Sequence, residues 1–406
     1  MRVLLTANAS YVPPRGGATR SNLIWLDQMA AAGHQCRIVC GASGEGAELR
    51  FHSSIAVFAV ADPARRIQLL REQIRDFRPD WVLVSSEDLS HALLREAHHS
   101  ARGRVVYLAH TPQFFPFGPA SWNPDREAAQ LVAQAAGVVS IGRHMAEYIF
   151  DSLGRTAAVI HPPIYGPGPF PDFANFDQGL VTMINPCAVK GISLFLETAA
   201  RLPNTAFGVV PGWGTTAADR HALEQLPNVR VLPNARQIDD ILSQTRVLLM
   251  PSLWYEGFGL IVMEAMLRGI PVVASDSGGL VEAKRGTGYV IPVRTIARYL
   301  PEFDEHAMPR PVIESNDPAP WAAAVHELLT DRAAYDREAL ASRTASAQFV
   351  AALDAAEMER YLKALPACAA APAVHSTTAL HSSIESLSPE KRALLLDRLR
   401  KRKAVE

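Results

Sequence analysis

The sequence predicts an α/β protein with two doubly wound domains, each a parallel sheet covered by helices on both faces. Short apolar runs typical of buried strands alternate with segments of helical spacing over most of the 406 residues. The alternation stops at His161–Gly179, which contains five prolines and three glycines, and then starts again. We therefore place a domain boundary in this segment.

In the first half, apolar runs predict strands at Val3–Leu5, Arg37–Cys40, Trp81–Val84, Val105–Leu108, Val138–Ser140 and Ala157–Ile160. Helices are expected between them at Ser21–Ala32, Ala64–Phe77, Glu127–Ala136 and His144–Leu153. In the second half, strands are expected at Val181–Ile184, Phe207–Val210, Val229–Leu232, Val247–Met250 and Pro271–Ala274. Its helices are expected at Ile192–Arg201, Ala217–Leu226 and Leu260–Arg268.

The remaining segments are Pro-rich or rich in small residues. Residues 294–320 are expected to form an insertion or lid, and helices follow from Trp321 to about Leu365. We divide the chain into two doubly wound domains (1–165 and 166–365), a flexible linker (366–386) and a basic amphipathic tail helix (387–406).

Composition excludes several classes of protein. The net charge is −1, with 40 basic and 41 acidic residues, which gives no field for gripping nucleic acid or an anionic membrane. The four cysteines show neither metal-ligand spacing nor a disulfide framework: Cys36, Cys40, Cys187 and Cys368. The chain shows no complete secretory signal and no apolar stretch of about 20 residues. We expect a cytoplasmic protein without stable membrane insertion.

The loop after the first predicted strand lacks both a dinucleotide fingerprint and a P-loop. This absence argues against hydride transfer and ATP hydrolysis. The loop does carry Gly16 and Gly17 immediately before a helix, where backbone amides can approach a phosphate. An ordinary turn explains such a glycine pair equally well.

The segment PSLWYEGFGLIVMEAMLRGIPVVASDSGG, from Pro251 to Gly279, is more informative. It predicts a strand end, a turn carrying Glu256, and a helix that begins near Gly259 and carries Glu264. The amides of Phe258, Gly259 and Leu260 would lie at the helix N-terminus, which favours an anion. Two carboxylates eight residues apart could bind sugar hydroxyls at the two ends of a diphosphate. By spacing alone, an exposed helical acid and a first-turn acid remain the alternative.

This E-x7-E element resembles the signature of retaining GT-B glycosyltransferases of the GT4 type. It is preceded by PS and followed by G-PVV-S and GG. The segment INPCAVKGISLFLETAARLP is similar to the family's phosphate-binding R-x4-K-G element, and YLAHTP at Tyr107–Pro112 and the Gly16–Gly17 loop also fit. The resemblance spans roughly residues 1–365 and implies two Rossmann-like domains facing a cleft. It further implies that the domain at 1–165 binds the acceptor and that the domain at 166–365 binds the nucleotide sugar.

The resemblance implies roles for individual residues. Lys190 would neutralise the donor diphosphate, Glu256 would bind the transferred sugar, Glu264 would bind the ribose, and His110 would lie under the donor sugar. We take His110, Glu256 and Lys190 as catalytic, and the implied donor-binding set is Gly16, Gly17, Asn185, Lys190, Glu256, Gly257, Phe258, Gly259, Leu260 and Glu264.

Asn185 departs from the family pattern, because it stands where the family usually has arginine. An amide supplies neither charge nor a bidentate fork. Arg15, Arg236 or another residue would have to substitute, or the leaving group is stabilised less. His34 is expected to be a packing or turn residue.

Four aromatic residues follow His110 on a proline-rich loop: Phe114, Phe115, Phe117 and Trp122. They could stack on a sugar or line an apolar acceptor channel. A hydrophobic plug that holds the loop down is the favoured alternative.

The sequence thus predicts a retaining glycosyltransferase that moves a sugar from a nucleoside diphosphate sugar to an acceptor hydroxyl. No metal site is apparent, and we expect metal-independent front-face displacement. The alternatives are a donor-binding but inactive partner protein and another GT-B enzyme, such as a phosphorylase or an epimerase. The donor base and sugar and the acceptor are not determined by these motifs.

The tail segment LSPEKRALLLDRLR, beginning at Leu387, resembles leader helices of nonribosomal peptide and polyketide assembly lines. The resemblance implies docking onto an assembly-line protein and a peptide, polyketide or lipopeptide acceptor. A solvated helix or a weak membrane-surface contact is the alternative.

Overall fold

The structure is a computed structural model that describes residues 1–366 except 15, 43, 45 and 236. Residues 1–365 form one compact unit. The expected linker, apart from Pro366, and the expected tail helix at 387–406 lie outside the described residues, as do Cys368, Arg15 and Arg236.

The first half contains an eight-stranded sheet with the strand order β3-β4-β2-β1-β5-β6-β7-β8. Its strands are β1 (Arg2–Thr6), β2 (Gln35–Cys40), β3 (Ala47–His52), β4 (Ile55–Val60), β5 (Trp81–Ser85), β6 (Val105–Ala109), β7 (Gly137–Ser140) and β8 (Ala158–Val159). All neighbouring pairs are parallel except β3 and β4. Alternate residues of β1 enter separate core clusters, Val3 in one and Leu4 in the other, so apolar side chains cover both faces of the sheet.

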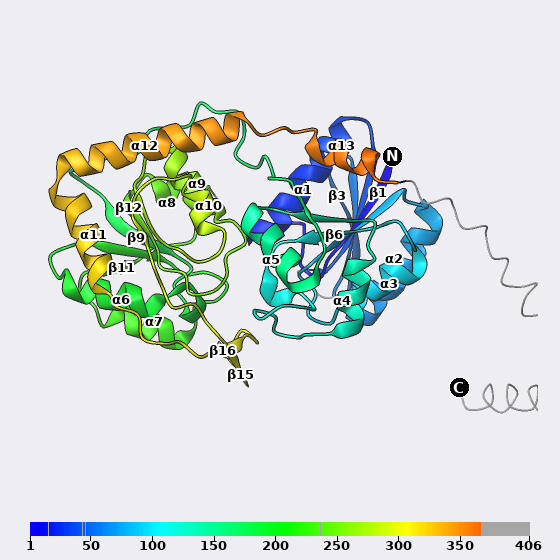
Figure 1. Ribbon diagram of the computed structural model, residues 1–406, viewed down its shortest axis with the longest axis horizontal. Coiled ribbons are helices and arrows are strands. Elements are labelled where there is room, and N and C mark those ends of the chain that lie inside the picture. The colour runs from blue at the N-terminus through cyan, green and yellow to red at the C-terminus, as the bar shows by residue number, and fades with distance from the viewer. Residues whose placement is uncertain (15, 43, 45, 236, 367–406) are drawn as a thin grey trace, which may run out of the picture. The chain divides into compact units, whose positions relative to one another are not determined.

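Five α-helices accompany this sheet in the described part of the first half (Figure 1). They are α1 (Gly16–Ala31), α2 (Pro63–Phe77), α3 (Ala92–Ser100), α4 (Arg126–Ala133) and α5 (Arg143–Leu153), with a 3₁₀ turn η1 at Pro112–Phe114. Asp62 and Asp125 cap α2 and α4 by accepting hydrogen bonds from the amides of Arg65 and Ala128, which explains where these two helices begin.

The second half repeats the arrangement around a six-stranded parallel sheet with the order β11-β10-β9-β12-β13-β14. Its strands are β9 (Leu180–Ile184), β10 (Phe207–Val210), β11 (Val229–Val231), β12 (Thr245–Met250), β13 (Val272–Ser275) and β14 (Val290–Ile291). The helical segments are the 3₁₀ turn η2 (Ala188–Lys190), α6 (Ile192–Arg201), α7 (Ala217–Glu224), α8 (Asp239–Leu242), α9 (Leu260–Leu267) and α10 (Leu280–Ala283). The predicted two-sheet GT-B architecture is confirmed.

Three C-terminal helices complete the unit: α11 (Ala319–Thr330), α12 (Arg332–Ala351) and α13 (Glu357–Ala364). Helix α12 packs on α9 of the second half, whereas α13 returns to the first (Figure 1). Glu359 pairs with His34 at 2.8 Å, and the Tyr361 hydroxyl donates to the Val138 carbonyl at 3.4 Å. The domain boundaries at 165 and 365 stay predictions. Helix α13 falls within the predicted second domain, but it packs against the first half.

Some elements were missed or misplaced by the sequence patterns. The β3–β4 hairpin was not predicted. The edge strand β3 exposes most of its residues and carries charges among its apolar ones, whereas the apolar, mostly buried run of β4 was a signal that the sequence analysis overlooked. Helix α1 begins at Gly16 rather than at Ser21. The expected insertion at 294–320 contains an antiparallel pair, β15 (Tyr299–Phe303) and β16 (Pro309–Pro311).

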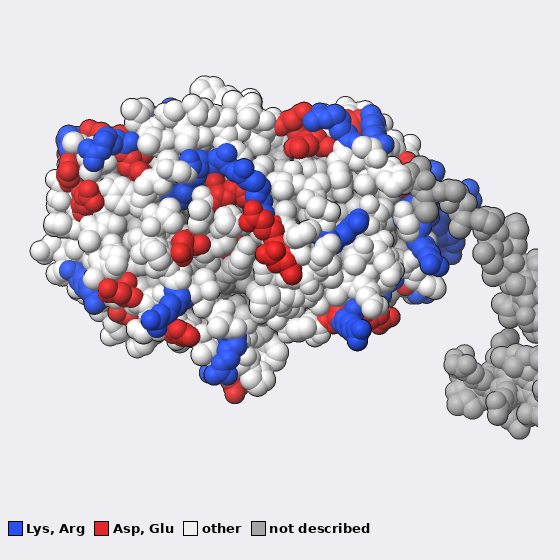
Figure 2. Space-filling view, in the orientation of Figure 1, with Lys and Arg blue, Asp and Glu red and all other residues white. Residues whose placement is uncertain are grey.

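The surface charge reflects the near-equal numbers of acidic and basic residues, and the helices agree with the expected lack of a membrane-spanning segment. On the face shown in Figure 2, acidic and basic side chains form small interspersed groups. Within the described residues, every helix is too short or too polar to cross a bilayer.

A buried ion pair attaches α12 to the second sheet. Lys284 is fully buried, and its ammonium donates to the Val272 carbonyl at 2.6 Å and to Glu338 at 3.0 Å. Glu338 also accepts from the Gly288 amide at 3.1 Å. Burial lowers the pKa of Lys284, and the Glu338 carboxylate opposes this effect. The buried Lys284 ammonium therefore depends on the Glu338 carboxylate as its counter-charge.

Removing one of these charges should destabilise the fold. Glu338→Gln should lower the free energy of unfolding by about 3 kcal/mol, because it leaves a buried ammonium without a counter-charge. Denaturant titration measures the loss, and the Lys284→Met/Glu338→Gln double variant should recover part of it. The exposed Arg332–Asp177 pair provides the control, since Asp177→Asn, which leaves the contact of Arg332 with the Phe176 ring in place, should cause no measurable loss. Equal losses at the two sites would contradict the importance of burial.

Candidate functional site

The two carboxylates of the E-x7-E element lie before and within α9. Gly259 has φ +106°, a conformation that other residues rarely adopt, and a Cβ there would lie 2.7 Å from Leu280 Cδ2. The helix therefore begins at Leu260, as the sequence predicted. Glu256 lies in the preceding loop and Glu264 in the second helical turn, and both are buried. Glu264 is thus not the exposed helical acid that spacing alone allowed.

Lys190 and Glu256 lie in direct contact. The Lys190 ammonium donates to Glu256 Oε1 at 2.5 Å, and the Ser252 hydroxyl donates to the same oxygen at 2.6 Å. Lys190 is held at the end of η2 and lies 4.3 Å from the centre of the Trp254 ring, a favourable cation–π position. Glu256 Oε2 has no hydrogen-bond partner among the described residues.

Glu264 pairs with a residue that the sequence analysis did not select. Arg20 of α1 donates to Glu264 Oε1 at 2.9 Å. The glycine pair at the start of α1 also reaches α9, because a Cβ on Gly17 would lie 2.9 Å from Leu260 Cδ1. The first half therefore contributes directly to the surroundings of Glu264. Arg20 lies one helical turn after Gly16, which was the available signal in the sequence.

Asn185 has a structural environment that limits its role. Its φ is +57°, and its Oδ1 accepts from the Gly214 amide at 3.0 Å. The Nδ2 atom is buried without a partner among the described residues. The side chain thus fixes the turn against the loop after β10, and it provides no positive charge in place of the family's usual arginine.

His110 lies at the end of β6 in a buried polar network. Its Nε2 is 2.7 Å from Asn22 Oδ1, while Asn22 Nδ2 donates to Tyr11 at 2.8 Å and to Ser85 at 3.2 Å. Since Asn22 Oδ1 can only accept, Nε2 carries the hydrogen and Nδ1 is an unpartnered acceptor in the described part of the chain. Burial lowers the pKa of His110 to about 3, so the ring is neutral.

The loop after Glu256 is pressed against His110. A Cβ on Gly257 would lie 2.3 Å from the His110 carbonyl oxygen, so a larger residue cannot occupy this position without displacing the backbone. Phe258 is buried beside His161 and Phe349, with ring centroids 5.0 and 5.7 Å away. The structure thus brings His110 and the E-x7-E loop together.

The expected acceptor aromatics divide into two pairs. Phe115 and Phe117 are buried in a core cluster with Tyr148, which fits the favoured alternative of a hydrophobic plug that holds the loop down. Phe114 and Trp122 instead pack on each other at 5.3 Å between ring centroids. Trp122 also contacts residues of the second half, Trp254 at 6.3 Å and Tyr299 of β15 at 5.4 Å.

A second contact between the halves involves Glu282 of α10. Its carboxylate accepts from the Arg143 amide at 2.6 Å at the start of α5, where Gly142 provides no side-chain cap. Burial acts to raise the pKa of Glu282, but His161 and the amides of Arg143 and His144 outweigh it and hold the pKa below its ordinary value. Sequence patterns missed Glu282 because its partner is distant in the chain.

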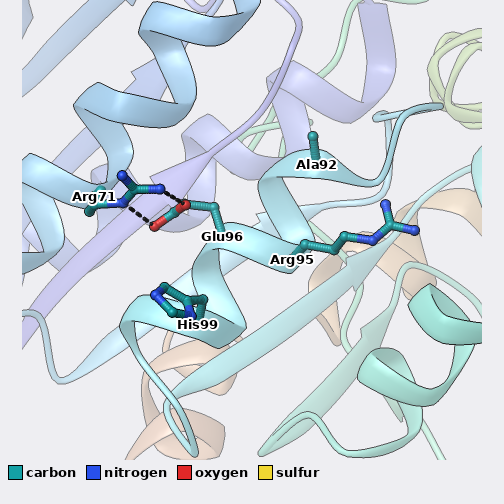
Figure 3. A pocket seen from close by; sticks show the side chains of 5 residues that line it. All are labelled: Arg71, Ala92, Arg95, Glu96 and His99. Carbon is teal, nitrogen blue, oxygen red and sulfur yellow. Dashed lines mark hydrogen bonds and ion pairs between the residues drawn. The ribbon is translucent and has the colours of Figure 1, made fainter. Parts of the chain in front are cut away.

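Two surface pockets lie apart from the predicted donor residues. One, shown in Figure 3, is lined by Arg71, Ala92, Arg95, Glu96 and His99. The Arg71 guanidinium forms a bidentate ion pair with the Glu96 carboxylate, with N–O distances of 3.0 and 2.7 Å. The other adjoins the Glu282 contact. The described residues contain no group of three or more His, Cys, Asp or Glu side chains that could hold a metal ion.

Comparison with known families decides the classification. A family model described as glycosyltransferase family 4 matches residues 15–165, and one described as group 1 glycosyl transferases matches residues 179–331. Together the matches cover more than half of the chain. The chain belongs to glycosyltransferase family 4. The enzyme is therefore a nucleotide-sugar-dependent glycosyltransferase of a retaining family.

Solved structures show the same fold at low identity. The glycosyltransferase is similar to Anabaena HepE in complex with UDP and glucose, at 16% identity and a TM-score of 0.65, over 89% of this chain and 98% of that one. It is similar to WaaG, a glycosyltransferase of lipopolysaccharide biosynthesis, at 16% identity and a TM-score of 0.62, over 90% and 100% of the two chains. The trehalose-6-phosphate synthase OtsA matches at 12% identity and a TM-score of 0.62, over 90% and 100%.

No curated protein matches the glycosyltransferase. The two family models end before the expected tail at 387–406, and the comparisons give no support to its resemblance to assembly-line leader helices.

The neutral His110 ring predicts a pH dependence of stability. Its folded pKa of about 3 lies below the ordinary 6.5, so its contribution is complete above about pH 6.5 and is lost as the pH falls toward 3. Between pH 7.5 and pH 5 the wild type should lose on the order of 2 kcal/mol more unfolding free energy than His110→Gln. Denaturant titrations at the two pH values measure this, and parallel losses would contradict a buried neutral ring.

Proposed function

We propose that this glycosyltransferase moves a sugar from a nucleoside diphosphate sugar to an acceptor hydroxyl, using the residues around Glu256 and Glu264. The contact between Lys190 and Glu256 is the observation that carries the proposal. It supports the proposal because a cation and the carboxylate proposed to bind the sugar lie together at the N-terminal side of α9, where helix amides favour an anion. The UDP and glucose named for HepE make a uridine diphosphate sugar the first donor to test.

Each carboxylate retains binding capacity in this arrangement. The hydrogen bonds to the side chains of Glu256 and Glu264 from described residues all go to Oε1. The second oxygens are proposed to accept from hydroxyls, those of the transferred sugar at Glu256 and those of the ribose at Glu264. His110 Nδ1 is the proposed acceptor for a further donor-sugar hydroxyl, because it has no partner among the described residues.

The proposed reaction retains the configuration of the transferred sugar by front-face displacement. The bond between the anomeric carbon and the diphosphate oxygen breaks, and the acceptor oxygen forms its bond on the same face. The acceptor proton passes to the leaving diphosphate. Lys190 stabilises the charge that develops on this leaving group, and Glu256 orients the sugar without forming a bond to it.

The acceptor is proposed to enter beside the Phe114 and Trp122 side chains. Both rings are partly buried at the contact between the halves, and Trp122 meets Trp254, which packs over Lys190. Aromatic faces of this kind bind sugar rings or other apolar groups by stacking. The chemical class of the acceptor is left to the experiment.

The two carboxylates should differ in their effects on slow donor hydrolysis and nucleotide binding. Glu264→Ala should weaken nucleotide binding by about ten- to a hundredfold, because the ribose loses hydrogen bonds to a charged group. Glu256→Ala should mainly lower turnover. Calorimetry with UDP and GDP, and hydrolysis of a panel of nucleotide sugars, separate the two effects.

The matched control for these variants is Glu96→Ala. Glu96 is a buried carboxylate that is also paired with an arginine, but it lies in α3, away from the donor residues. It should retain wild-type binding and hydrolysis. If both Glu256→Ala and Glu264→Ala behave like the control, the proposed donor site is wrong. If the wild type hydrolyses no donor, an inactive donor-binding protein becomes the better interpretation.

Activity should persist in excess EDTA, because Lys190 and the α9 amides are proposed to neutralise the diphosphate. Donor hydrolysis is measured before and after chelation and after return of Mg²⁺ or Mn²⁺. A complete loss that either ion reverses would show that a metal neutralises the diphosphate instead.

A further inference from the structure

We propose that Arg20 supplies the second positive charge of the donor site, binding the donor diphosphate while it remains paired with Glu264. The inference rests on the proposed function, since it deepens the description of the same site. The family usually places a positive charge, an arginine, at position 185 in the second half. We assign that charge to Arg20 in the first half instead.

The local charge balance motivates the assignment. The Lys190 ammonium is already paired with Glu256 at 2.5 Å, and Asn185 is neutral with its Nδ2 atom buried. A diphosphate entering this site would therefore meet little uncompensated positive charge from these residues. A second cation near α9 with N–H donors to spare would supply phosphate contacts that these residues lack.

Arg20 has the position and the free donors that this role requires. Its guanidinium contacts Glu264 through one nitrogen at 2.9 Å, and its side chain is 44% exposed, whereas that of Glu264 is 8% exposed. A guanidinium has five N–H donors in a planar fork, so contact with one carboxylate oxygen leaves donors for a neighbouring phosphate. The ribose and the diphosphate are adjacent in a nucleotide. One arginine can therefore contact both the carboxylate proposed to bind the ribose and the neighbouring phosphate.

The backbone places this guanidinium beside the proposed phosphate position. Arg20 lies one turn after Gly16, and the Gly17 position is in close contact with Leu260, the first residue of α9. Both helices therefore present their N-terminal ends in this region. Arg20 and the α9 amides would then bind the same anion from opposite halves of the protein.

An unsatisfied phenol provides a separate sign that a ligand belongs here. The Tyr165 hydroxyl is buried and has no hydrogen-bond partner among the described residues. Burial and then the Glu264 carboxylate raise the pKa of Tyr165 well above its ordinary value, while Arg20 acts to lower it, which places the phenol near both charges. A polar ligand beside Arg20 and Glu264 would give this hydroxyl a partner.

The inference predicts that Arg20 distinguishes a nucleotide's phosphates from its nucleoside. In Arg20→Gln, binding of UDP or GDP should weaken by about ten- to a hundredfold, the cost of losing a charge-assisted contact. Binding of uridine or guanosine should change by less than about twofold, because Glu264 keeps its oxygens for the ribose. Arg20→Lys, which keeps the charge without the fork, should fall between wild type and Arg20→Gln.

Competition titrations with these four probes at constant ionic strength measure the effects. The control is Arg65→Gln, because Arg65 is 46% exposed and pairs with Glu72 at 3.1 Å on α2, outside the donor residues. It should leave all affinities unchanged. Glu264→Gln should weaken nucleoside and nucleotide binding alike. Melting temperatures verify that each variant is folded.

Two results would overturn the inference alone: equal weakening of nucleoside and diphosphate binding in Arg20→Gln, which would limit Arg20 to orienting Glu264, or unchanged diphosphate binding. If the wild type binds neither UDP nor GDP while remaining folded, the proposed donor site fails and the inference fails with it.

Discussion

The loop that carries Glu256 and Gly257 packs against the first sheet, and almost no space remains between the two backbones. The His110 carbonyl leaves no room for a side chain at position 257, and Gly142 at the start of α5 lies against the same loop, where a Cβ would be 2.9 Å from Glu282 and 3.3 Å from the Gly257 carbonyl. This close approach determines what can surround a donor. Glu256 faces Lys190 from within the second half, Glu264 faces Arg20 from the first, and His110 lies directly behind the loop. A bulky residue at position 257 would therefore displace the loop from His110 and disturb all of these contacts at once.

Charges at the site are arranged in neutral pairs rather than as a positive field. Lys190 is matched by Glu256 and Arg20 by Glu264. Such pairing reduces the cost of burying ions in the absence of ligand. It also leaves each carboxylate with a second oxygen, so the side chains that form the ion pairs are the ones proposed to bind hydroxyls of the donor. On the face shown in Figure 2, basic and acidic side chains lie in mixed groups, which is consistent with recognition by local contacts rather than by long-range attraction.

The sequence predicted most of the fold because continuous apolar strands leave a strong signal. The range expected for α6 matched the structure, and so did that for β10. The exposed edge strand β3 and the short helix α8 left weaker patterns and were missed. For the candidate site, local motifs selected Glu256, Glu264 and Lys190, and the structure brings Lys190 and Glu256 into contact. They could not identify Arg20 or Glu282, whose partners lie 244 and 139 residues away in the chain. They also could not separate the buried Phe115 from the partly exposed Phe114, because both lie on one short loop.

The return of α13 to the first sheet means that the chain passes between the halves twice, once through His161–Gly179 and once between α12 and α13. A single connection would leave the halves free to twist about it as well as to bend. Two connections resist twisting more than one does. The C-terminal helices thereby help to keep the two halves aligned, although none of the residues proposed to bind the donor lies on them.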